Sequence, residues 1–257
     1  MKTLAVIPAR LGATRLPRKP LRLLAGRPLV VRVWERVVAL DLADRVVVAT
    51  DSDEVAEAAR AAGAEVAMTS PDHPSGTDRV AEVAAQRAFA AYEAVLNVQG
   101  DEPFVSAVAV RGALALVTDG RFPVGTAAAS APIEILATPN VVKVVAADDG
   151  RALYFSRAPI PFLRDAEDAS RLAPRVRQHL GIYAYDRDAL RRWVSLPPHP
   201  LERIERLEQL RPLAAGIAIG VAEADESPRP GIDTEQDLVR ANAAWSEHTA
   251  TLSAGHS

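Results

Sequence analysis

The sequence predicts an α/β fold built on a parallel sheet, and three observations carry that prediction. Short runs rich in β-branched residues alternate with longer, alanine-rich amphipathic stretches through the first 117 residues, which is the βαβα order of a parallel sheet covered by helices. The short runs are apolar throughout, as expected for strands buried on both faces. Of the 257 residues, 49% are hydrophobic, so the chain can bury a large core.

The first half of the chain divides into four strand–helix pairs. In order, the expected strand and helix of each pair are 4–8 with 28–40, 46–50 with 53–62, 66–69 with 77–91, and 94–99 with 106–117. Pro28 suits the first turn of a helix, Ser52 or Asp53 can cap the second helix, and Gly63 follows its end. These pairs predict the parallel part of the sheet.

The pattern changes from about Pro123. Strand-like runs follow one another there without long helices between them, which predicts mixed or antiparallel strands. The expected elements are strands at 141–146, 152–155 and 180–185, a mobile excursion at 164–177, a helix at 201–210, a strand at 217–221, a helix at 234–245 and a frayed end at 249–257. Neither a repeat nor a low-complexity linker occurs, which favours one continuous domain with an insertion.

Composition and charge exclude several classes of protein. The chain has no cysteine, which excludes disulfides, cysteine-ligated metal and thiol catalysis. Its net charge of −3 offers no overall attraction to nucleic acid. No apolar run reaches 18 residues and no hydrophobic signal segment is visible. We therefore expect a cytoplasmic protein with no nucleic-acid partner and no membrane insertion.

A basic loop follows the first predicted strand. Residues 9–22 contain no acid and five cations, which are Arg10, Arg15, Arg18, Lys19 and Arg22. Open α/β sheets bind ligands beyond the carboxyl ends of their strands, and arginine and lysine suit phosphate. Gly12 and Ala13 would let backbone amides approach it. Neither GxxxxGK[ST] nor GxGxxG follows this strand, which disfavours P-loop and NAD enzymes. The loop predicts a polyphosphate site, with a merely solvated basic loop as the alternative.

Carboxylates follow the fourth predicted strand and recur far away in sequence. Asp101 and Glu102 stand in a QGDEP turn, and Asp233 stands in a GIDT turn. Asp51, at the end of the second strand, is a weaker candidate. Carboxylates in turns are often caps or Asx turns, so these residues alone do not decide between a structural role and a metal site.

Eight segments, in order along nearly the whole chain, carry a family resemblance. They are IPARLGATRLPRKPL from residue 7, VVVATDSDEVAEAARAAGAEVAMT from 46, HPSGTDR from 73, NVQGDEP from 97, ALYFSRAPIP from 152, HLGIYAY from 179, PLERIERLEQLR from 200 and GIDTEQDL from 231. Together they resemble the sugar-activating nucleotidyltransferases, most closely the 3-deoxy-manno-octulosonate cytidylyltransferases, or CMP-Kdo synthetases. The resemblance implies a Rossmann-like nucleotidyltransferase (nucleotide-diphospho-sugar transferase) three-layer fold. It also implies a single domain over 1–257, with a mixed β insertion at about 123–215 that shapes the sugar site and a dimer contact.

The resemblance also implies an activity and a set of site residues. The activity is transfer of CMP from CTP to the anomeric hydroxyl of Kdo, releasing pyrophosphate and activating Kdo for lipopolysaccharide biosynthesis, with Mg²⁺ as cofactor and a homodimer as the assembly. The implied catalytic residues are Arg10, Lys19, Asp101 and Asp233, of which Asp101 and Asp233 hold the metal. The implied nucleotide residues are Arg10, Arg15, Lys19, Ser75, Gly76 and Gln99. The implied sugar residues are Arg157, His179, Tyr183, Glu208 and Gln209.

Alternatives remain at the level of the residues and of the substrate. Taken alone, Ser75 and Gln99 suit a turn and a strand end, His179 suits a structural role, and Arg157 suits a salt bridge. His179 and Tyr183 are four apart, which places both on one face of a strand. The alternative acceptors are an 8-amino Kdo analogue, sialic acid or methylerythritol phosphate, and a more remote alternative is a nucleotide-binding regulator without turnover.

Three positions depart from the usual family pattern. Ala13 stands where serine is common, and Arg18 and Ala184 stand where glycine is common. Ala13 removes a hydroxyl donor near phosphate, and Arg18 adds charge and bulk to the loop.

Overall fold

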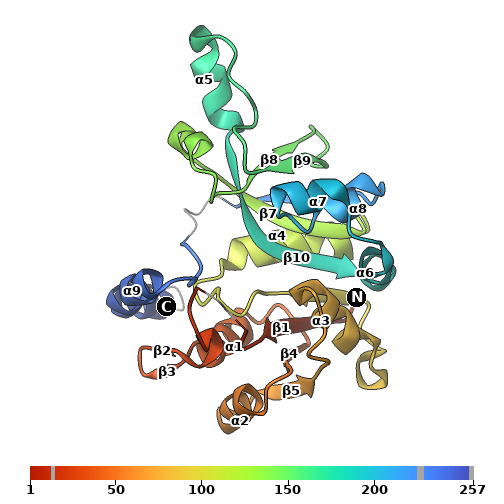
Figure 1. The fold of residues 1–257 in the computed structure, drawn as a ribbon, viewed down its shortest axis with the longest axis vertical. Coiled ribbons are helices and arrows are strands. Elements are labelled where there is room, and N and C mark those ends of the chain that lie inside the picture. Colours follow the sequence, from red (N-terminus) through yellow and green to blue (C-terminus); the bar gives the residue numbers. More distant parts are fainter. Residues whose placement is uncertain (13–14, 225–228, 255–257) are drawn as a thin grey trace.

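The computed structural model describes residues 1–12, 15–224 and 229–254 and confirms the predicted α/β class (Figure 1). Its centre is a mixed sheet of nine strands, seven of which run in the order β11-β7-β10-β6-β1-β4-β5. The parallel part is β6 (Ala94–Asn97), β1 (Thr3–Ala9), β4 (Arg45–Thr50) and β5 (Glu65–Met68). These are the four strands that the alternation predicts.

Helices join these strands, and three of the four begin at a serine that caps them. They are α1 (Leu29–Leu40), α2 (Asp53–Ala61), α3 (Gly76–Ala85) and α4 (Ala107–Thr118). The hydroxyls of Ser52, Ser75 and Ser106 each accept a hydrogen bond from the backbone amide three residues on, which stabilises the first turn. The predicted helix over 77–91 is too long, because α3 ends at Ala85 and a separate 3₁₀ turn follows.

The second half of the chain extends the same sheet. Strand β10 (Arg177–Asp186) runs antiparallel to β6 and to β7 (Val124–Ser130), and β11 (Ile219–Ala224) runs parallel to β7. β8 (Lys143–Ala146) and β9 (Ala152–Ser156) form an antiparallel pair beside β10. The prediction missed β7, whose small residues give little strand signal. A Cβ on Gly125 would lie 2.1 Å from the carbonyl oxygen of Ala113 in α4, so close packing on α4 requires this composition.

The helices of the second half differ more from prediction. α6 (Arg187–Ser195) was not expected. The single helix predicted at 201–210 is two helices, α7 (Pro200–Glu205) and α8 (Leu210–Ala214), because Arg206 adopts a left-handed φ of 55°. The segment predicted as a mobile excursion contains α5 (Ala169–Leu172) between 3₁₀ turns and projects from the molecule (Figure 1).

The final helix, α9 (Glu235–Ala254), is longer than predicted and includes part of the end expected to be frayed. It packs against the short hairpin of β2 (Leu23–Leu24) and β3 (Arg27–Pro28) (Figure 1). Asn242 accepts a hydrogen bond from the amide of Ala25 and donates one to the carbonyl of Leu23.

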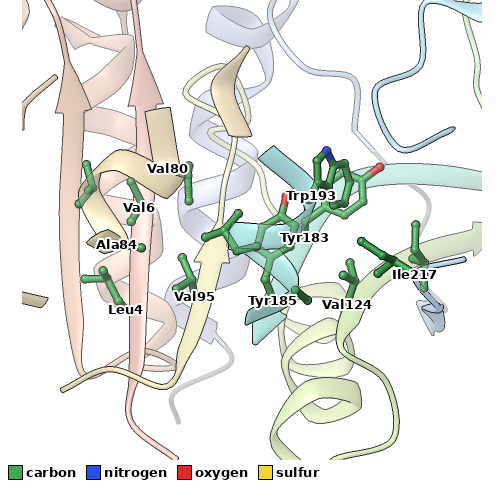
Figure 2. Packing of buried hydrophobic residues seen from close by; sticks show 14 of the residues in the cluster. Leu4, Val6, Val80, Ala84, Val95, Val124, Tyr183, Tyr185, Trp193 and Ile217 are labelled. Carbon is green, nitrogen blue, oxygen red and sulfur yellow. The ribbon is translucent and has the colours of Figure 1, made fainter. Parts of the chain in front are cut away.

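Helices cover both faces of the sheet, which gives three layers. Leu4 and Val6 of β1 pack with α3, in a buried cluster that extends past β6 to the rings of Tyr183, Tyr185 and Trp193 (Figure 2). The intervening Ala5 and Ile7 pack on the other face with α1 and α4. Burial on both faces explains why the strand is apolar at every position. Within the described residues, no helix is both long enough and apolar enough to cross a membrane.

Candidate active site

A pocket of about 370 Å³ lies at the carboxyl ends of β1 and β6. Close backbone packing shapes its floor at Gly100, where a Cβ would lie 2.6 Å from the carbonyl oxygen of Pro8. The structure brings all eight residues predicted for nucleotide and metal to this pocket. They are Arg10, Arg15, Lys19, Ser75, Gly76, Gln99, Asp101 and Asp233.

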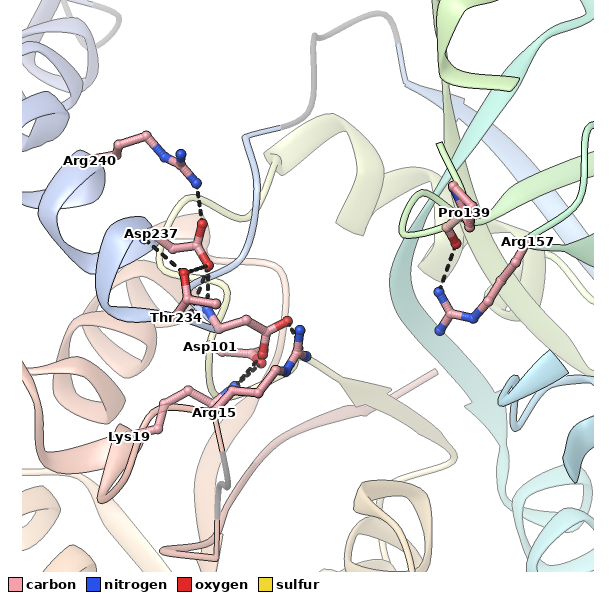
Figure 3. Close-up of polar contacts among 9 residues, drawn as sticks. Arg15, Lys19, Asp101, Pro139, Arg157, Thr234, Asp237 and Arg240 are labelled. Atoms are coloured by element: carbon pink, nitrogen blue, oxygen red, sulfur yellow. Dashed lines mark hydrogen bonds and ion pairs between the residues drawn. The ribbon is translucent and has the colours of Figure 1, made fainter. Parts of the chain in front are cut away.

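Two carboxylates from distant parts of the sequence converge on one ammonium group. Nζ of Lys19 donates to Oδ2 of Asp101 at 2.6 Å and to Oδ1 of Asp233 at 2.9 Å (Figure 3). Arg15 donates to Oδ2 of Asp233 at 2.9 Å. The backbone amide of Ile232 donates to the carbonyl oxygen of Asp101 at 2.9 Å, so the QGDEP and GIDT turns are joined through the backbone as well.

The turn that carries Asp233 is ordered by the start of α9. The carboxylate of Asp237 accepts hydrogen bonds from the backbone amides of Asp233 and Thr234 and from the hydroxyl of Thr234, which in turn accepts from the amide of Asp237 (Figure 3). This is a reciprocal helix cap. It fixes the backbone of Asp233 while leaving its carboxylate directed at Lys19.

The donor set of this cluster fits a hard divalent cation. Asp101 and Asp233 supply carboxylate oxygens from two turns to one place, where the Lys19 ammonium shows that a positive charge is favoured. Mg²⁺ takes one or two carboxylates and completes its shell with water and substrate phosphate. Among the described residues, no group of three or more histidine, aspartate or glutamate side chains forms a fuller metal site.

The charges of the cluster shift two pKa values. Burial acts to lower the pKa of Lys19, but the carboxylates of Asp101 and Asp233 outweigh it and raise that pKa above its ordinary value. Burial, together with the charges of Asp101 and Asp233, raises the pKa of Glu102 to about 8. Sequence reasoning gave Glu102 no role, although it adjoins Asp101. Glu102 is therefore mostly protonated near pH 7, and the negative charge beside Lys19 comes from Asp101 and Asp233.

The positive charge of the basic loop, residues 9–22, is largely offset by acids from other parts of the chain. Acids from elsewhere pair with four of its five cations: Lys19 and Arg15 as above, Arg18 with Glu54, and Arg22 with Glu235. Within the part of the chain that the structure describes, Arg10 has no ion pair and lines the pocket. Arg10 is thus the loop cation most readily available to an incoming anion.

The structure describes two of the three positions that depart from the family pattern, Arg18 and Ala184. Arg18 has a left-handed φ of 56°, which glycine adopts without strain, and its side chain turns to Glu54 instead of lining the pocket. Ala184 is fully buried in β10, between Leu96 and Gly125 of its neighbouring strands. Ala13 lies outside the described residues.

A serine links the nucleotide pocket to the predicted sugar residues. Oγ of Ser75 lies 2.9 Å from Oε1 of Glu208 and 2.6 Å from Oδ2 of Asp78. The hydroxyl has one hydrogen and can donate it to only one of these carboxylates at a time. Burial raises the pKa of Glu208. Gln209, next in sequence, is buried.

His179 and Tyr183 share one face of β10, with ring centroids 5.4 Å apart. Between them the strand forms a bulge: His179 pairs with Ala128 but Tyr183 pairs with Thr126, and Gly181 adopts a left-handed φ of 68°. Nε2 of His179 lies 2.9 Å from Oγ1 of Thr126. Burial lowers the pKa of His179 to about 3, so the ring is neutral near pH 7.

Arg157 does not line the pocket and is held by backbone groups. Its Nε donates to the carbonyl oxygen of Glu205 at 2.9 Å, and its Nη1 donates to that of Pro139 at 3.2 Å (Figure 3). The carboxylate of Glu205 accepts from the hydroxyl of Ser156 and from the amide of Arg157. The turn after β9 is therefore fixed to α7, and no carboxylate pairs with the Arg157 guanidinium among the described residues.

Arg79 also lines the pocket, and sequence reasoning missed it. It is buried in α3, with Nη2 3.2 Å from Oδ2 of Asp51 and Nη1 bonded to the hydroxyl of Thr69. Asp51, the weaker carboxylate candidate, is thus an arginine partner, while Ser52 caps the helix. The signal available in sequence was the arginine of HPSGTDR, a cation inside an otherwise apolar helix face.

We expect Gly181→Ala to raise the KM for the predicted sugar substrate several-fold and to leave the KM for the predicted nucleotide substrate unchanged. Alanine has room at this position, but the left-handed conformation costs roughly 1–2 kcal/mol, which would shift the bulge that places His179. The matched control is Gly216→Ala, which has the same room and a φ of 77°. Steady-state kinetics on both variants, with thermal melts, make the test; equal sugar KM values in both would contradict it.

Comparisons with known proteins agree with this geometry. The pattern of the cytidylyltransferase family matches residues 4–219. A 3-deoxy-manno-octulosonate cytidylyltransferase from Gemmatimonas aurantiaca is 65% identical over 255 residues, which is 99% of this chain and 98% of that protein. A solved CMP:2-keto-3-deoxy-manno-octonic acid synthetase in complex with CTP is 40% identical, with a TM-score of 0.88 over 96% of this chain and 99% of that one. At 15% identity, a 4-diphosphocytidyl-2C-methyl-D-erythritol synthase from Anaerococcus prevotii shares the fold, with a TM-score of 0.61 over 95% of this chain and 98% of that one.

Proposed function

Because this chain belongs to the cytidylyltransferase family, and within it to the 3-deoxy-manno-octulosonate cytidylyltransferases, we propose that it transfers CMP from CTP to the anomeric hydroxyl of Kdo. The products are CMP-Kdo and pyrophosphate. The observation that carries the proposal is identity of 65% over nearly the full chain to a relative of that name. The pocket of cations and carboxylates supports the proposal, because its charges suit a triphosphate and a divalent cation.

The reaction is an in-line substitution at phosphorus. The hydroxyl oxygen of the sugar forms a bond to the α-phosphorus of CTP as the bond from that phosphorus to the bridging oxygen of pyrophosphate breaks, and the hydroxyl proton passes to water. No covalent bond to the protein is needed. Arg10, Arg15 and Lys19 offset the charge of the triphosphate and of the leaving pyrophosphate, so the protein acts through positioning and charge.

Mg²⁺ is the cofactor of this proposal, held by Asp101 and Asp233. When bound, it supplies charge stabilisation at phosphate and favours deprotonation of a hydroxyl. The bond from Ile232 to Asp101 and the cap at Asp237 hold the two carboxylates together. Lys19 pairs with both carboxylates and Arg15 pairs with Asp233, so these two cations offset the two negative charges.

The acceptor is placed by the second half of the chain. Arg157, His179, Tyr183, Glu208 and Gln209 are the proposed sugar residues. The contact between Ser75 and Glu208 joins the sugar and nucleotide groups, which supports a shared reaction site. We further propose a cytoplasmic homodimer that serves lipopolysaccharide biosynthesis, with residues 123–215 shaping the dimer contact; sedimentation of the purified chain checks the dimer.

The function is tested by pyrophosphate release with Mg²⁺ and CTP. Kdo, its 8-amino analogue, sialic acid, methylerythritol phosphate and no acceptor are compared, and the product mass is read directly. We expect release that depends on Kdo and a mass equal to CMP-Kdo. Release with only another acceptor would show that the sugar specificity proposed here is wrong. CTP binding without any turnover would favour the alternative of a nucleotide-binding regulator.

A further inference from the structure

The hydroxyl of Thr126 in β7 contacts two groups at once. Its Oγ1 lies 2.6 Å from the carbonyl oxygen of Ile182 and 2.9 Å from Nε2 of His179. The hydroxyl has a single hydrogen, and a carbonyl oxygen can only accept. At 2.6 Å the hydrogen must lie between the two oxygens, so Thr126 donates to Ile182. Toward His179 the hydroxyl can then only accept.

The bulge of β10 makes this arrangement possible. Residues 180–182 have no partner in the β10–β7 register, since pairing passes from His179 directly to Tyr183. The carbonyl of Ile182 is therefore available to a side chain, and Gly181 allows the turn that directs it there. Thr126 is fully buried, so water does not compete for its hydrogen.

The tautomer of His179 follows from these bonds. Because Thr126 accepts, Nε2 of the imidazole carries the hydrogen, and in the neutral ring Nδ1 is then a bare acceptor. The ring stays neutral near pH 7 because burial depresses its pKa. Two aromatic rings lie beside it: Phe155 in an edge-to-face arrangement with the centroids 5.0 Å apart, and Tyr183 tilted with the centroids 5.4 Å apart. Among the described residues, no hydrogen bond to Nδ1 is present.

We propose that Thr126 is a positioning residue which fixes His179 as the Nε2–H tautomer, so that Nδ1 accepts a hydrogen bond from a hydroxyl of the acceptor sugar. The role of the sugar in this proposal rests on the proposed function, whereas the tautomer of His179 follows from its hydrogen bonds alone. A neutral acceptor repels carboxylate and phosphate, so His179 selects a hydroxyl or amine donor, and the acid group of the substrate must be bound elsewhere.

The first test reads the tautomer in the free protein. In ¹⁵N-labelled protein, two-bond imidazole spectra distinguish Nε2–H from Nδ1–H, and a His179→Gln sample assigns the signal among the five histidines. We expect Nε2–H in the wild type and in Thr126→Ser, and a mixture of tautomers in Thr126→Val. The Nδ1–H tautomer in the wild type would overturn the inference, whatever reaction the protein catalyses.

The second test separates positioning from structure. Thr126→Val should raise KM for the sugar about three- to tenfold, the size expected for one neutral hydrogen bond, while kcat and KM for CTP stay within twofold. Thr126→Ser should restore the sugar KM. Equal sugar KM in valine and serine variants would contradict the proposal. A wild type that uses no sugar acceptor would refute the proposed function instead and leave the spectroscopic test intact.

Discussion

Asp101→Asn should lower kcat for CMP transfer at least a hundredfold with the fold intact. The substitution keeps the size of the side chain and removes the charge of one of the two carboxylates that converge on Lys19. Asparagine is a much weaker ligand for Mg²⁺, and a hundredfold loss corresponds to about 2.7 kcal/mol of transition-state stabilisation. Because Asp101 is only partly buried, the protein should unfold at nearly the same temperature.

The test measures kcat over a titration of Mg²⁺, with Asp119→Asn as the matched control. Asp119 is an exposed aspartate at the end of α4 and does not line the pocket. The control should keep wild-type kcat. Near-normal turnover of Asp101→Asn at saturating Mg²⁺ would remove Asp101 from the proposed metal pair.

Lys19→Met should lower kcat/KM for CTP by a hundredfold or more. Methionine reproduces the apolar part of the side chain but lacks the ammonium, so the cation between Asp101 and Asp233 is lost. The negative charge of the two carboxylates and of the triphosphate is then less well offset. Lys19→Arg should not restore activity, because a guanidinium is larger and presents its donors in a fixed planar fork, whereas the site fits the compact charge of an ammonium. Mg²⁺ should also raise the melting temperature of Lys19→Met more than that of the wild type, since a cation then replaces the missing charge.

The control for Lys19→Met is Arg18→Met in the same loop. Arg18 pairs with Glu54 and does not line the pocket, so this variant should stay within about twofold of the wild type. If both variants lose CTP affinity to the same extent, the effect belongs to the general charge of the loop. A loss confined to Lys19 would support its specific place between the carboxylates.

The parallel half of the fold was predictable because its signals are local. Strands such as β1 are apolar on both faces, and Ser52 and Ser106 mark where helices begin. The second half was predictable in part: β8, β9, β10, β11 and α9 overlap the expected ranges. The features that were missed depend on contacts and conformations with little local signal. β7 is a strand of small residues whose size is set by α4, and α7 and α8 are separated by one left-handed residue, Arg206.

The candidate site, like the fold, was predictable in part. The residues that line the pocket follow motifs that sequence resemblance could find, and the structure brings them together. Their partners could not be found, because each depends on a long-range contact. Thr126 is ordinary in sequence and matters only because the bulge at Gly181 turns a carbonyl toward it. Arg18, Arg15 and Arg22 have acid partners at least 36 residues away, which a local count of charge cannot reveal.

The pairing of Asp101 with Asp233 has a consequence for the order in which the protein is made. The two residues belong to turns joined by the bond from Ile232 to Asp101, and 132 positions separate them. A chain emerging from the ribosome can complete the nucleotide-facing strands early, but it has only one of the two carboxylates until Asp233 has emerged. The nascent polypeptide should therefore be catalytically silent through most of translation, and activity should arise only once the turn before α9 closes on the sheet.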